Sequence, residues 1–313
     1  MTPASSAVTV RIPASSANLG PGFDVLGVAL TLYSDLTVRR TEHPECHFRG
    51  NWHSRWDEIA MGMIRTVENL FYRESLLKPV PLAYDLDNGV PVARGLGSST
   101  VIRAGVLKAL NTLGGEPLDT TRLLELIAHL EGSPDNASAT MLGGLTVSGF
   151  VNGRLRYVRF PVSSVLRFVA LVPTGEVATD EARSIFPKDI SRDDAIGNAG
   201  RLALIVTAFA KERYELLQDL FDDVFHQPHR EKHYPELRAL TAVTRAAREA
   251  GALGAYLSGS GSTMMAVTLQ HAREVGQAME ETFNRENRGT GYSCRILHLQ
   301  CDNNGTILTG TDS

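Results

Sequence analysis

A glycine-rich loop followed by small hydroxyl residues constrains this chain more than any other feature. The stretch is PVARGLGSST at residues 91–100, and apolar residues at helical spacing follow it. Glycine lets a backbone approach a ligand closely, and the first N–H groups of a helix have no partner inside the helix. Those donors and the positive end of the helix dipole favour a bound phosphate group. Taken alone, the loop is equally compatible with a plain connecting turn, because it matches neither a Walker loop nor a Rossmann fingerprint.

Length and composition predict a two-lobed globular protein that binds a small ligand. A chain of 313 residues exceeds the size at which one hydrophobic core usually stops growing. Apolar residues make up 43% of the chain and the formal net charge is -4, so no basic field indicates nucleic acid binding. A small molecule is therefore the expected partner.

The cysteines and the apolar runs predict a cytoplasmic protein without a membrane partner. The 3 cysteines are odd in number and show no CxxC spacing, so neither a disulfide framework nor a zinc ribbon is expected. The N-terminus lacks the pattern of a signal peptide. The apolar-rich run at residues 202–210, which contains Thr207, is far too short to cross a bilayer.

Hydrophobic periodicity predicts mixed helices and strands in both halves of the chain. The expected strands cover residues 8–12, 25–38, 144–150, 155–160, 166–172, 254–257, 264–269 and 293–299. The expected helices cover residues 57–73, 101–113, 120–131, 193–212, 236–250 and 271–285. Regular βαβ alternation is absent, so the predicted fold class is α+β, with lobes at 1–164 and 165–313.

Two further stretches change the meaning of the glycine loop. ASSANLGPGFDVLG at residues 14–27 contains Asn18 and Asp24, and LSGSGST at residues 257–263 is a second glycine-serine loop. In this order the three stretches resemble the signature motifs of the GHMP kinase superfamily, and in detail those of the homoserine kinases. The match also includes EGSPDNASATMLGGL, the Ala182-Arg183 pair with Phe186-Pro187, FHQPHR at 225–230, and GAYLSGSGST.

The resemblance implies an N-terminal lobe of the ribosomal protein S5 domain 2 type and a ferredoxin-like C-terminal lobe, with ATP and an acceptor between them. The implied triphosphate-binding residues are Pro91, Arg94, Gly95, Leu96, Gly97, Ser98, Ser99 and Thr100, with Gly259, Ser260 and Gly261 from the other lobe. Ser98 or Ser99 would hold Mg²⁺ together with Glu131. Mg²⁺ prefers few carboxylates plus phosphate oxygens and waters. Without its neighbours, Glu131 would be a solvated carboxylate at a helix end.

The resemblance also implies how an amino-acid acceptor is held. Asp24 would bind its ammonium group, and Arg183 and Arg230 would bind its carboxylate in a two-pronged geometry. Asn136 would lie near the acceptor hydroxyl. A neutral amide cannot act as a general base, so the implied catalytic set of Asn136, Glu131 and Ser98 works by positioning and electrostatics.

Several residues leave alternatives open. Asn18 contacts the acceptor or holds its loop, and Asp135 holds the turn after Pro134 or orients the substrate. Ser133 stands where homoserine kinases carry histidine, in an EGHPDN pattern, and serine is shorter and never positively charged. This departure is either neutral drift or a sign of a larger hydroxy amino acid acceptor such as threonine. Thr100, where alanine is common, and Ser262, where proline is usual after SGSG, are milder departures from the family pattern.

Residues outside the motifs are expected to have ordinary structural roles. Trp52 and Trp56 are predicted to pack, although family members place adenine-contacting residues in this region. The histidines form no metal-binding pattern, and His226, His229 and His233 are predicted to be solvated in a charged loop.

The leading hypothesis is an ATP-dependent kinase that phosphorylates homoserine to O-phospho-L-homoserine for threonine synthesis. Asp24, Arg183 and Arg230 argue against diphosphomevalonate decarboxylase, which shares the fold. GLGSS, Glu131 and Asn136 argue against a binding module that has lost catalysis. A family tendency to dimerise is the only pointer to a homodimer.

Overall fold

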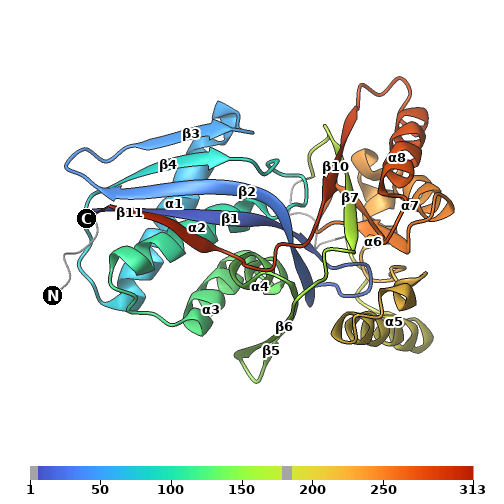
Figure 1. The fold of residues 1–313 in the computed structure, drawn as a ribbon, viewed down its shortest axis with the longest axis horizontal. Helices are drawn as coiled ribbons and strands as arrows, with labels where there is room; N and C mark the ends of the chain where they lie inside the picture. The colour runs from blue at the N-terminus through green and yellow to red at the C-terminus, as the bar shows by residue number, and fades with distance from the viewer. Residues whose placement is uncertain (1–5, 178–184, 313) are drawn as a thin grey trace.

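The strands of the described residues form two sheets, one in each lobe (Figure 1). The computed structural model describes residues 6–177 and 185–312. In the first sheet the order is β11-β1-β2-β4-β3, with β5 also paired to β2 and β6 paired to β5. Its strands are β1 (Ala7–Ala17), β2 (Leu26–Arg40), β3 (Cys46–Gly50), β4 (Leu82–Asn88), β5 (Leu145–Val151), β6 (Arg154–Phe160) and β11 (Ile307–Asp312). The second sheet has the order β10-β7-β9-β8, from β10 (Cys294–Leu299), β7 (Arg167–Pro173), β9 (Met264–Thr268) and β8 (Gly254–Leu257).

Helices cover one face of each sheet. On the first sheet these are α1 (Asp57–Ser75), α2 (Ser98–Leu113), α3 (Thr120–Glu131) and α4 (Asp135–Leu142). On the second sheet, α7 (Leu240–Glu249) and α8 (Ala272–Glu286) pack against each other and against the strands. The second lobe also contains α5 (Arg192–Ala210) and α6 (Gln227–His233). No helix in the described ranges has both the length and the apolar character that a membrane span needs.

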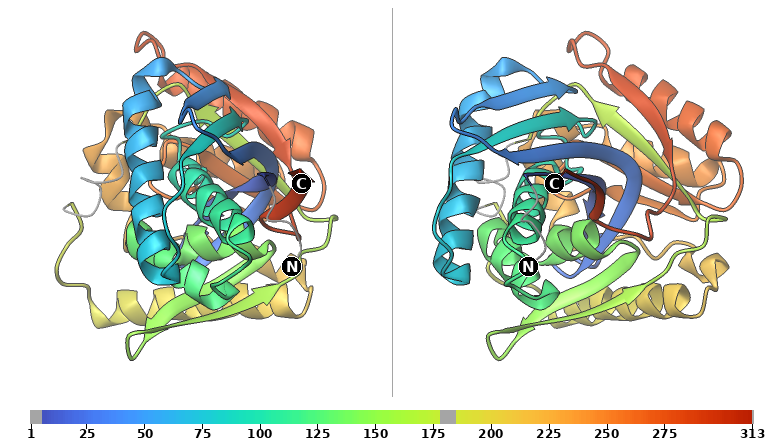
Figure 2. Two further views of the ribbon diagram at one scale, coloured as in Figure 1. Left: turned by 90° about the vertical axis from the view of Figure 1, so that its left-hand side faces the viewer. Right: turned by 60° about the vertical axis from the view of Figure 1, so that its left-hand side comes forward.

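The first two strands bend toward the second lobe. Pairing of β1 with β2 shifts register between Pro13 and Ala14, and both strands curve strongly beyond this point (Figure 2). A bulge adds a residue to one strand and increases its local bend and twist. The bend therefore carries the end of β1, and the turn that follows it, to the junction of the two lobes.

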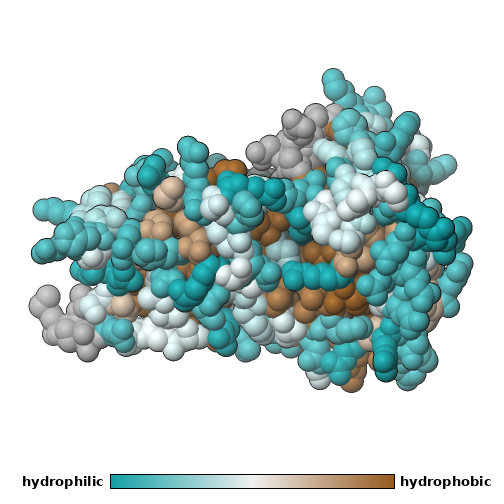
Figure 3. All heavy atoms as spheres, turned by 90° about the horizontal axis from the view of Figure 1, so that it is seen from above, coloured by the Kyte–Doolittle hydropathy of each residue, from teal (hydrophilic) through white to brown (hydrophobic). Residues whose placement is uncertain are grey.

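The two lobes share a hydrophobic core. On β7, Phe168, Ala170 and Val172 belong to the core cluster of the first lobe, whereas Val169 and Leu171 face the helices of the second. Successive strand residues point to opposite faces, so one sheet serves both clusters. Seen from above, apolar residues show mainly toward the middle of the molecule, where the lobes meet (Figure 3).

The predicted two-lobe α+β fold is confirmed. The hairpin predicted around Asn152-Gly153 is present as β5 and β6, whereas the helix predicted at 236–250 begins only at Leu240, after a 3₁₀ turn at Pro235–Leu237. The sequence prediction lacked β3, β4, α4, α6 and β11. The predicted division at residue 164 stays a prediction, and the topology adds that β11 leaves the second lobe and pairs with β1.

Candidate active site

Three glycine-rich segments that lie far apart in the sequence meet at the junction of the lobes. Ser258, in the loop between β8 and β9, donates from Oγ to the carbonyl oxygen of Gly95 at 2.6 Å. In the same loop, the Gly259 N–H donates to the Ala17 carbonyl oxygen at 3.2 Å. The loop therefore binds both the segment before α2 and the end of β1, which unites the three motifs predicted from the sequence.

Two of the glycines are required by close approach as well as by backbone conformation. Gly95 has φ +72°, and a Cβ there would stand 2.1 Å from the carbonyl oxygen of Ser258. Gly97 has φ +74°, and a Cβ there would stand 2.3 Å from Oγ of Ser15. A side chain at either position would have to displace its neighbours.

The N-terminus of α2 keeps backbone donors available. Its cap residue is Gly97, which has no side chain to bind the first turn. Within the described residues, no hydrogen bond to the N–H groups of Ser98, Ser99 or Thr100 is formed. These donors and the helix dipole make the end of α2 suitable for an anion.

Glu131 faces this helix end from the last residue of α3. Its Oε2 accepts from Oγ of Ser99 at 3.0 Å, and its Oε1 pairs with Nη1 of Arg103 at 2.6 Å. Ser98 instead accepts the N–H of Ala93 with its hydroxyl oxygen at 3.3 Å. Of the two candidate hydroxyls, only that of Ser99 contacts the carboxylate. Arg103 was missed from the sequence, although it lies one helical turn after Ser99 on the same face of α2.

A buried carboxylate lies at the start of α4. Asp135 accepts with Oδ1 from Oγ of Ser133 at 2.9 Å and from the N–H of Asn136 at 2.7 Å. Burial, together with the negative charge of Asp24, raises the pKa of Asp135 to about 6. Oδ1 of Asn136 in turn would be 3.4 Å from a Cβ at Gly97, so α4 begins beside the glycine loop.

Asn18 holds two loops together with its side-chain amide. Nδ2 donates to the carbonyl oxygen of Gly259 at 3.1 Å, and Oδ1 accepts the N–H of Asp24 at 3.1 Å. Asn18 is buried and has φ +73°, a conformation that asparagine tolerates better than most residues. Of its two predicted roles, the geometry supports loop fixation.

A chain of aromatic contacts starts at Phe23, the residue before Asp24. Phe23 stacks on His226 with ring centroids 5.1 Å apart and meets the edge of Phe186 at 5.3 Å. The guanidinium of Arg230 lies 5.2 Å from the centre of the Phe186 ring. Arg230 is buried in α6, and its predicted role in binding the acceptor carboxylate stays a prediction. Arg183, its predicted companion, lies outside the described residues.

The prediction that His226 is solvated in a charged loop is wrong. His226 is fully buried, and Asp223 accepts its N–H at 2.9 Å and that of Gln227 at 2.8 Å. These bonds start α6 and turn the imidazole inward, where Nε2 lies 3.3 Å from the carbonyl oxygen of Gly20. Burial lowers the pKa of His226, so the ring is neutral.

Comparison with known proteins identifies the family. Models of the GHMP kinase N-terminal and C-terminal domains match residues 59–144 and 205–285. A homoserine kinase of Clostridium beijerinckii is 36% identical over 308 residues, covering 97% of this chain and 99% of the relative. A homoserine kinase of Carboxydothermus hydrogenoformans is 35% identical, covering 96% of each chain. The chain belongs to the homoserine kinase branch of the GHMP kinases. It is therefore an ATP-using kinase for a hydroxyl group.

Solved structures agree with this assignment. The crystal structure of homoserine kinase from Cytophaga hutchinsonii matches with a TM-score of 0.85 and 26% identity, covering 99% of both chains. A mevalonate diphosphate decarboxylase of Enterococcus faecalis matches with a TM-score of 0.66 and 16% identity, covering 97% of this chain and 99% of the other. The second likeness extends to the fold alone.

In this GHMP kinase a cavity of about 540 Å³ opens beside the glycine loop. Its lining includes Trp52, Trp56, Pro91, Val92 and Pro173. Trp52 also packs as predicted, because its ring stacks on Phe48 and its indole N–H donates to Asp57. The cavity therefore combines aromatic and aliphatic walls within one surface.

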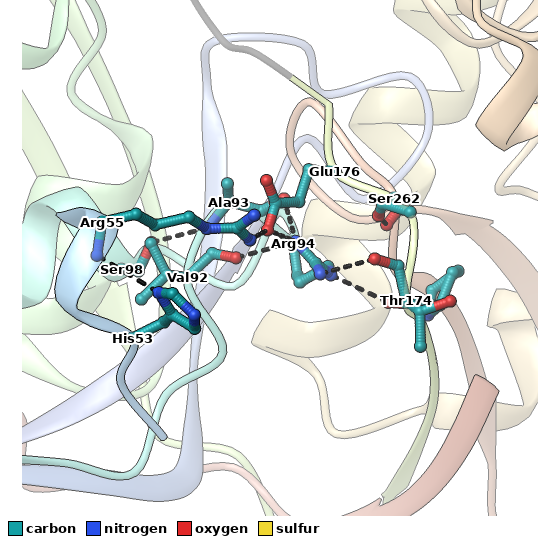
Figure 4. A network of polar contacts seen from close by, with 11 residues as sticks. His53, Arg55, Val92, Ala93, Arg94, Ser98, Thr174, Glu176 and Ser262 are labelled. Atoms are coloured by element: carbon teal, nitrogen blue, oxygen red, sulfur yellow. Dashed lines mark hydrogen bonds and ion pairs between the residues drawn. The ribbon is translucent and has the colours of Figure 1, made fainter. Parts of the chain in front are cut away.

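An ion-pair network joins the lobes at this cavity (Figure 4). Arg94 donates from Nη2 to the carbonyl oxygen of Thr174 at 2.6 Å and pairs through Nη1 with Glu176 at 3.1 Å. Arg55 pairs with the same carboxylate from the other side. Arg94 lies at this cavity, but its side chain is engaged by the segment that follows β7, and its role at the triphosphate stays a prediction.

The remaining predicted residues of the triphosphate site surround the loop contacts. Leu96 and Thr100 are buried, and Ser260 is half-buried. Gly261 donates its N–H to the carbonyl oxygen of Ser258 at 2.9 Å, which shapes the turn between β8 and β9. These residues support the loop, whereas the N–H donors that form no hydrogen bond within the described residues lie at the end of α2.

Proposed function

We propose that this protein transfers the terminal phosphate of ATP to the side-chain hydroxyl of L-homoserine, giving O-phospho-L-homoserine for threonine synthesis. The observation that carries the proposal is the contact between Glu131 and Ser99 at the open N-terminus of α2. The curated relatives supply the identity of the acceptor. The predicted cytoplasmic location and homodimer stay predictions.

The triphosphate would bind the loop from Gly95 to Thr100 and the end of α2. The close contact between Gly95 and the loop between β8 and β9 supports this role, because it fixes the loop from both lobes. The adjoining cavity with Trp52 and Trp56 would take the adenosine part, since flat aromatic walls suit a purine base.

Mg²⁺ would be held by Glu131 and Ser99. One carboxylate and one hydroxyl suit this ion, which keeps phosphate oxygens and waters as its other ligands. Among the described residues there is no group of three or more His, Cys, Asp or Glu side chains that could hold a metal. When bound, the ion neutralises charge on the transferring phosphate. Arg103 would compete for the Glu131 carboxylate and keep it in place when the metal leaves.

The acceptor would lie between α4, the turn after β1, and α6. Asp24 would bind its ammonium group, and Arg230 together with Arg183 its carboxylate. The buried position of Arg230 supports this role, because a buried guanidinium is suited to a strongly paired anion.

The chemical step needs no side-chain base. The acceptor oxygen forms the new bond to phosphorus while the bond to the ADP oxygen breaks, and the hydroxyl proton passes to the transferred phosphate. Alignment and charge stabilisation supply most of the rate in such transfers. Asn136 would donate from its side-chain amide to the reacting oxygens, which fits its place beside the glycine loop.

An ADP-release assay over homoserine, threonine, serine and mevalonate derivatives tests the proposal. We expect turnover with homoserine. A preference for another hydroxy amino acid would overturn the acceptor but retain the reaction class, and no turnover with any would refute kinase activity. Ser133→His restores the residue usual in homoserine kinases. If Ser133 sets the acceptor, this change alters the ranking of homoserine against threonine, and an unchanged ranking would mean neutral drift.

A further inference from the structure

A short chain of hydroxyl groups leads to the side chain of Asn136. Thr140 donates from Oγ1 to Oγ of Ser15 at 3.0 Å, and Ser15 donates from Oγ to Oδ1 of Asn136 at 2.9 Å. Ser15 and Thr140 are completely buried, so the bond between their hydroxyls is shielded from solvent, whereas the Ser15–Asn136 bond is partly buried. A hydroxyl carries one proton. Because Ser15 accepts from Thr140, its own proton goes to the amide oxygen of Asn136.

The hydroxyl of Ser15 also touches the glycine loop. A Cβ at Gly97 would stand 2.3 Å from Oγ of Ser15, so the loop packs directly on this hydroxyl. The N–H of Ser15 donates to the carbonyl oxygen of Leu96 at 3.2 Å. One residue of β1 therefore fixes both the loop beside the end of α2 and the amide at the start of α4.

An asparagine side chain has two unlike ends, and the Ser15 bond selects between them. The oxygen accepts hydrogen bonds and the NH₂ group donates two. Since Ser15 holds the oxygen, the NH₂ group is the end left for a ligand, and Asn136 is exposed enough to reach one. Reacting oxygens in phosphoryl transfer carry negative charge, which a donor stabilises and an amide oxygen would repel.

We propose that Ser15 and Thr140 are positioning residues that hold the Asn136 amide with its NH₂ group toward the reacting oxygens. The inference rests on the phosphoryl transfer proposed above. It assigns a role in that reaction to two buried hydroxyls that contact no substrate themselves. Ser15 acts directly on the amide, and Thr140 acts by directing the proton of Ser15.

Steady-state kinetics of single variants is the first test. Loss of one preorganised donor at a reacting oxygen typically lowers kcat by roughly 100-fold to 1000-fold. Asn136→Ala should approach this range, and Ser15→Ala should lower kcat by roughly 10-fold to 100-fold, because the amide is present but no longer held. Both KM values should change less than about threefold. Thr140→Val should lower kcat, and Thr140→Ser, which keeps the hydroxyl, should restore it.

A matched control separates positioning from simple loss of stability. Ser34 is buried and donates from Oγ to Oδ1 of Asn88 at 2.8 Å, which is the same kind of bond away from α4. Ser34→Ala should lower the urea midpoint of unfolding about as much as Ser15→Ala, yet change kcat less than twofold. Equal kcat losses in the two variants would overturn the proposal.

A double variant gives the sharpest outcome. If Ser15 acts through Asn136, adding Ser15→Ala to Asn136→Ala should lower kcat no further, and a multiplicative loss would overturn the proposal. The wild-type protein reports separately on the proposed function. If it phosphorylates a different hydroxy amino acid, the same variant series is measured with that acceptor, and the expected pattern is unchanged.

Discussion

Replacing Gly95 by alanine tests whether the close approach of the two loops is what the site requires. At Gly95 a Cβ would lie 2.1 Å from the Ser258 carbonyl oxygen and 2.9 Å from the Gly261 nitrogen, and φ is +72°. Gly115, between α2 and α3, offers a matched control. It has φ +81°, but a Cβ there would meet nothing within 4 Å. The two substitutions share backbone strain and differ in steric contact.

The difference in unfolding free energy follows from these contacts. Alanine in the left-handed conformation costs roughly 1–2 kcal/mol at either position. At Gly95 the neighbouring atoms belong to the backbone, so they cannot move aside by a rotamer change, and overpacking adds about 1–3 kcal/mol. We therefore expect a loss of roughly 2–5 kcal/mol for Gly95→Ala and about 1–2 kcal/mol for Gly115→Ala.

Urea unfolding and ADP release measure the two consequences. Gly95→Ala should also displace the loop, so we expect kcat/KM for ATP to fall at least about tenfold, which corresponds to about 1.4 kcal/mol. Gly115→Ala should leave kcat/KM unchanged. Equal free energies of unfolding for the two variants, or full activity in Gly95→Ala, would refute the reasoning from close approach.

Three further predictions concern charged groups of the site. Asp135, with its pKa of about 6, is negative above that pH and neutral below it, so kcat/KM for homoserine should fall as pH drops through 6, and Asp135→Asn should remove this inflection. The pKa of Asp135 in the folded protein exceeds that of an unfolded aspartate, which is about 3.9. The stabilising contribution of Asp135 is therefore complete below about pH 3.9 and is lost as the pH rises to about 6. Asp135→Asn should flatten this pH dependence of the free energy of unfolding in urea. Glu131→Gln should raise the Mg²⁺ concentration that gives half-maximal rate by about tenfold or more. Glu125→Gln, on the same helix, should leave it unchanged. If both variants need the same Mg²⁺ concentration, Glu131 does not bind the metal. Arg183→Ala should raise the KM of the acceptor far more than that of ATP, and equal effects would exclude carboxylate binding.

The motifs that sequence reasoning located are those whose chemistry is local. Gly95 and Gly97 stand out because their positive φ values suit glycine, and the hydroxyl residues after them follow in the same few positions. Strand β4 also has a local signal, because the apolar residues Leu82, Tyr84 and Leu86 alternate along it. This alternation is visible in the sequence alone, so β4 could have been predicted without the structure.

Other parts of the fold depend on contacts that no local pattern contains. Helix α4 has the sequence DNASATML and is buried on nearly all sides, so it lacks the apolar stripe of an amphipathic helix. β11 pairs with β1 across almost the whole length of the chain. Asp223 accepts the N–H of His226 at the start of α6, and the imidazole is buried there. The charged residues of this segment instead predict that His226 is exposed to solvent. Burial of this kind is decided by tertiary packing.

The two consecutive serines in β1 show why the sequence located the motif but not the roles within it. Successive strand residues point to opposite faces, so Ser15 and Ser16 cannot share a partner. Ser15 binds Asn136 in the first lobe, whereas Oγ of Ser16 lies 2.7 Å from Oγ of Ser258 in the second. The end of β1 therefore holds one lobe with each face, because both hydroxyls are buried and each needs its own partner. A shift of one residue that moved Ser15 to the place of Ser16 would put Ala14 opposite Asn136, and the amide would lose the bond that orients it.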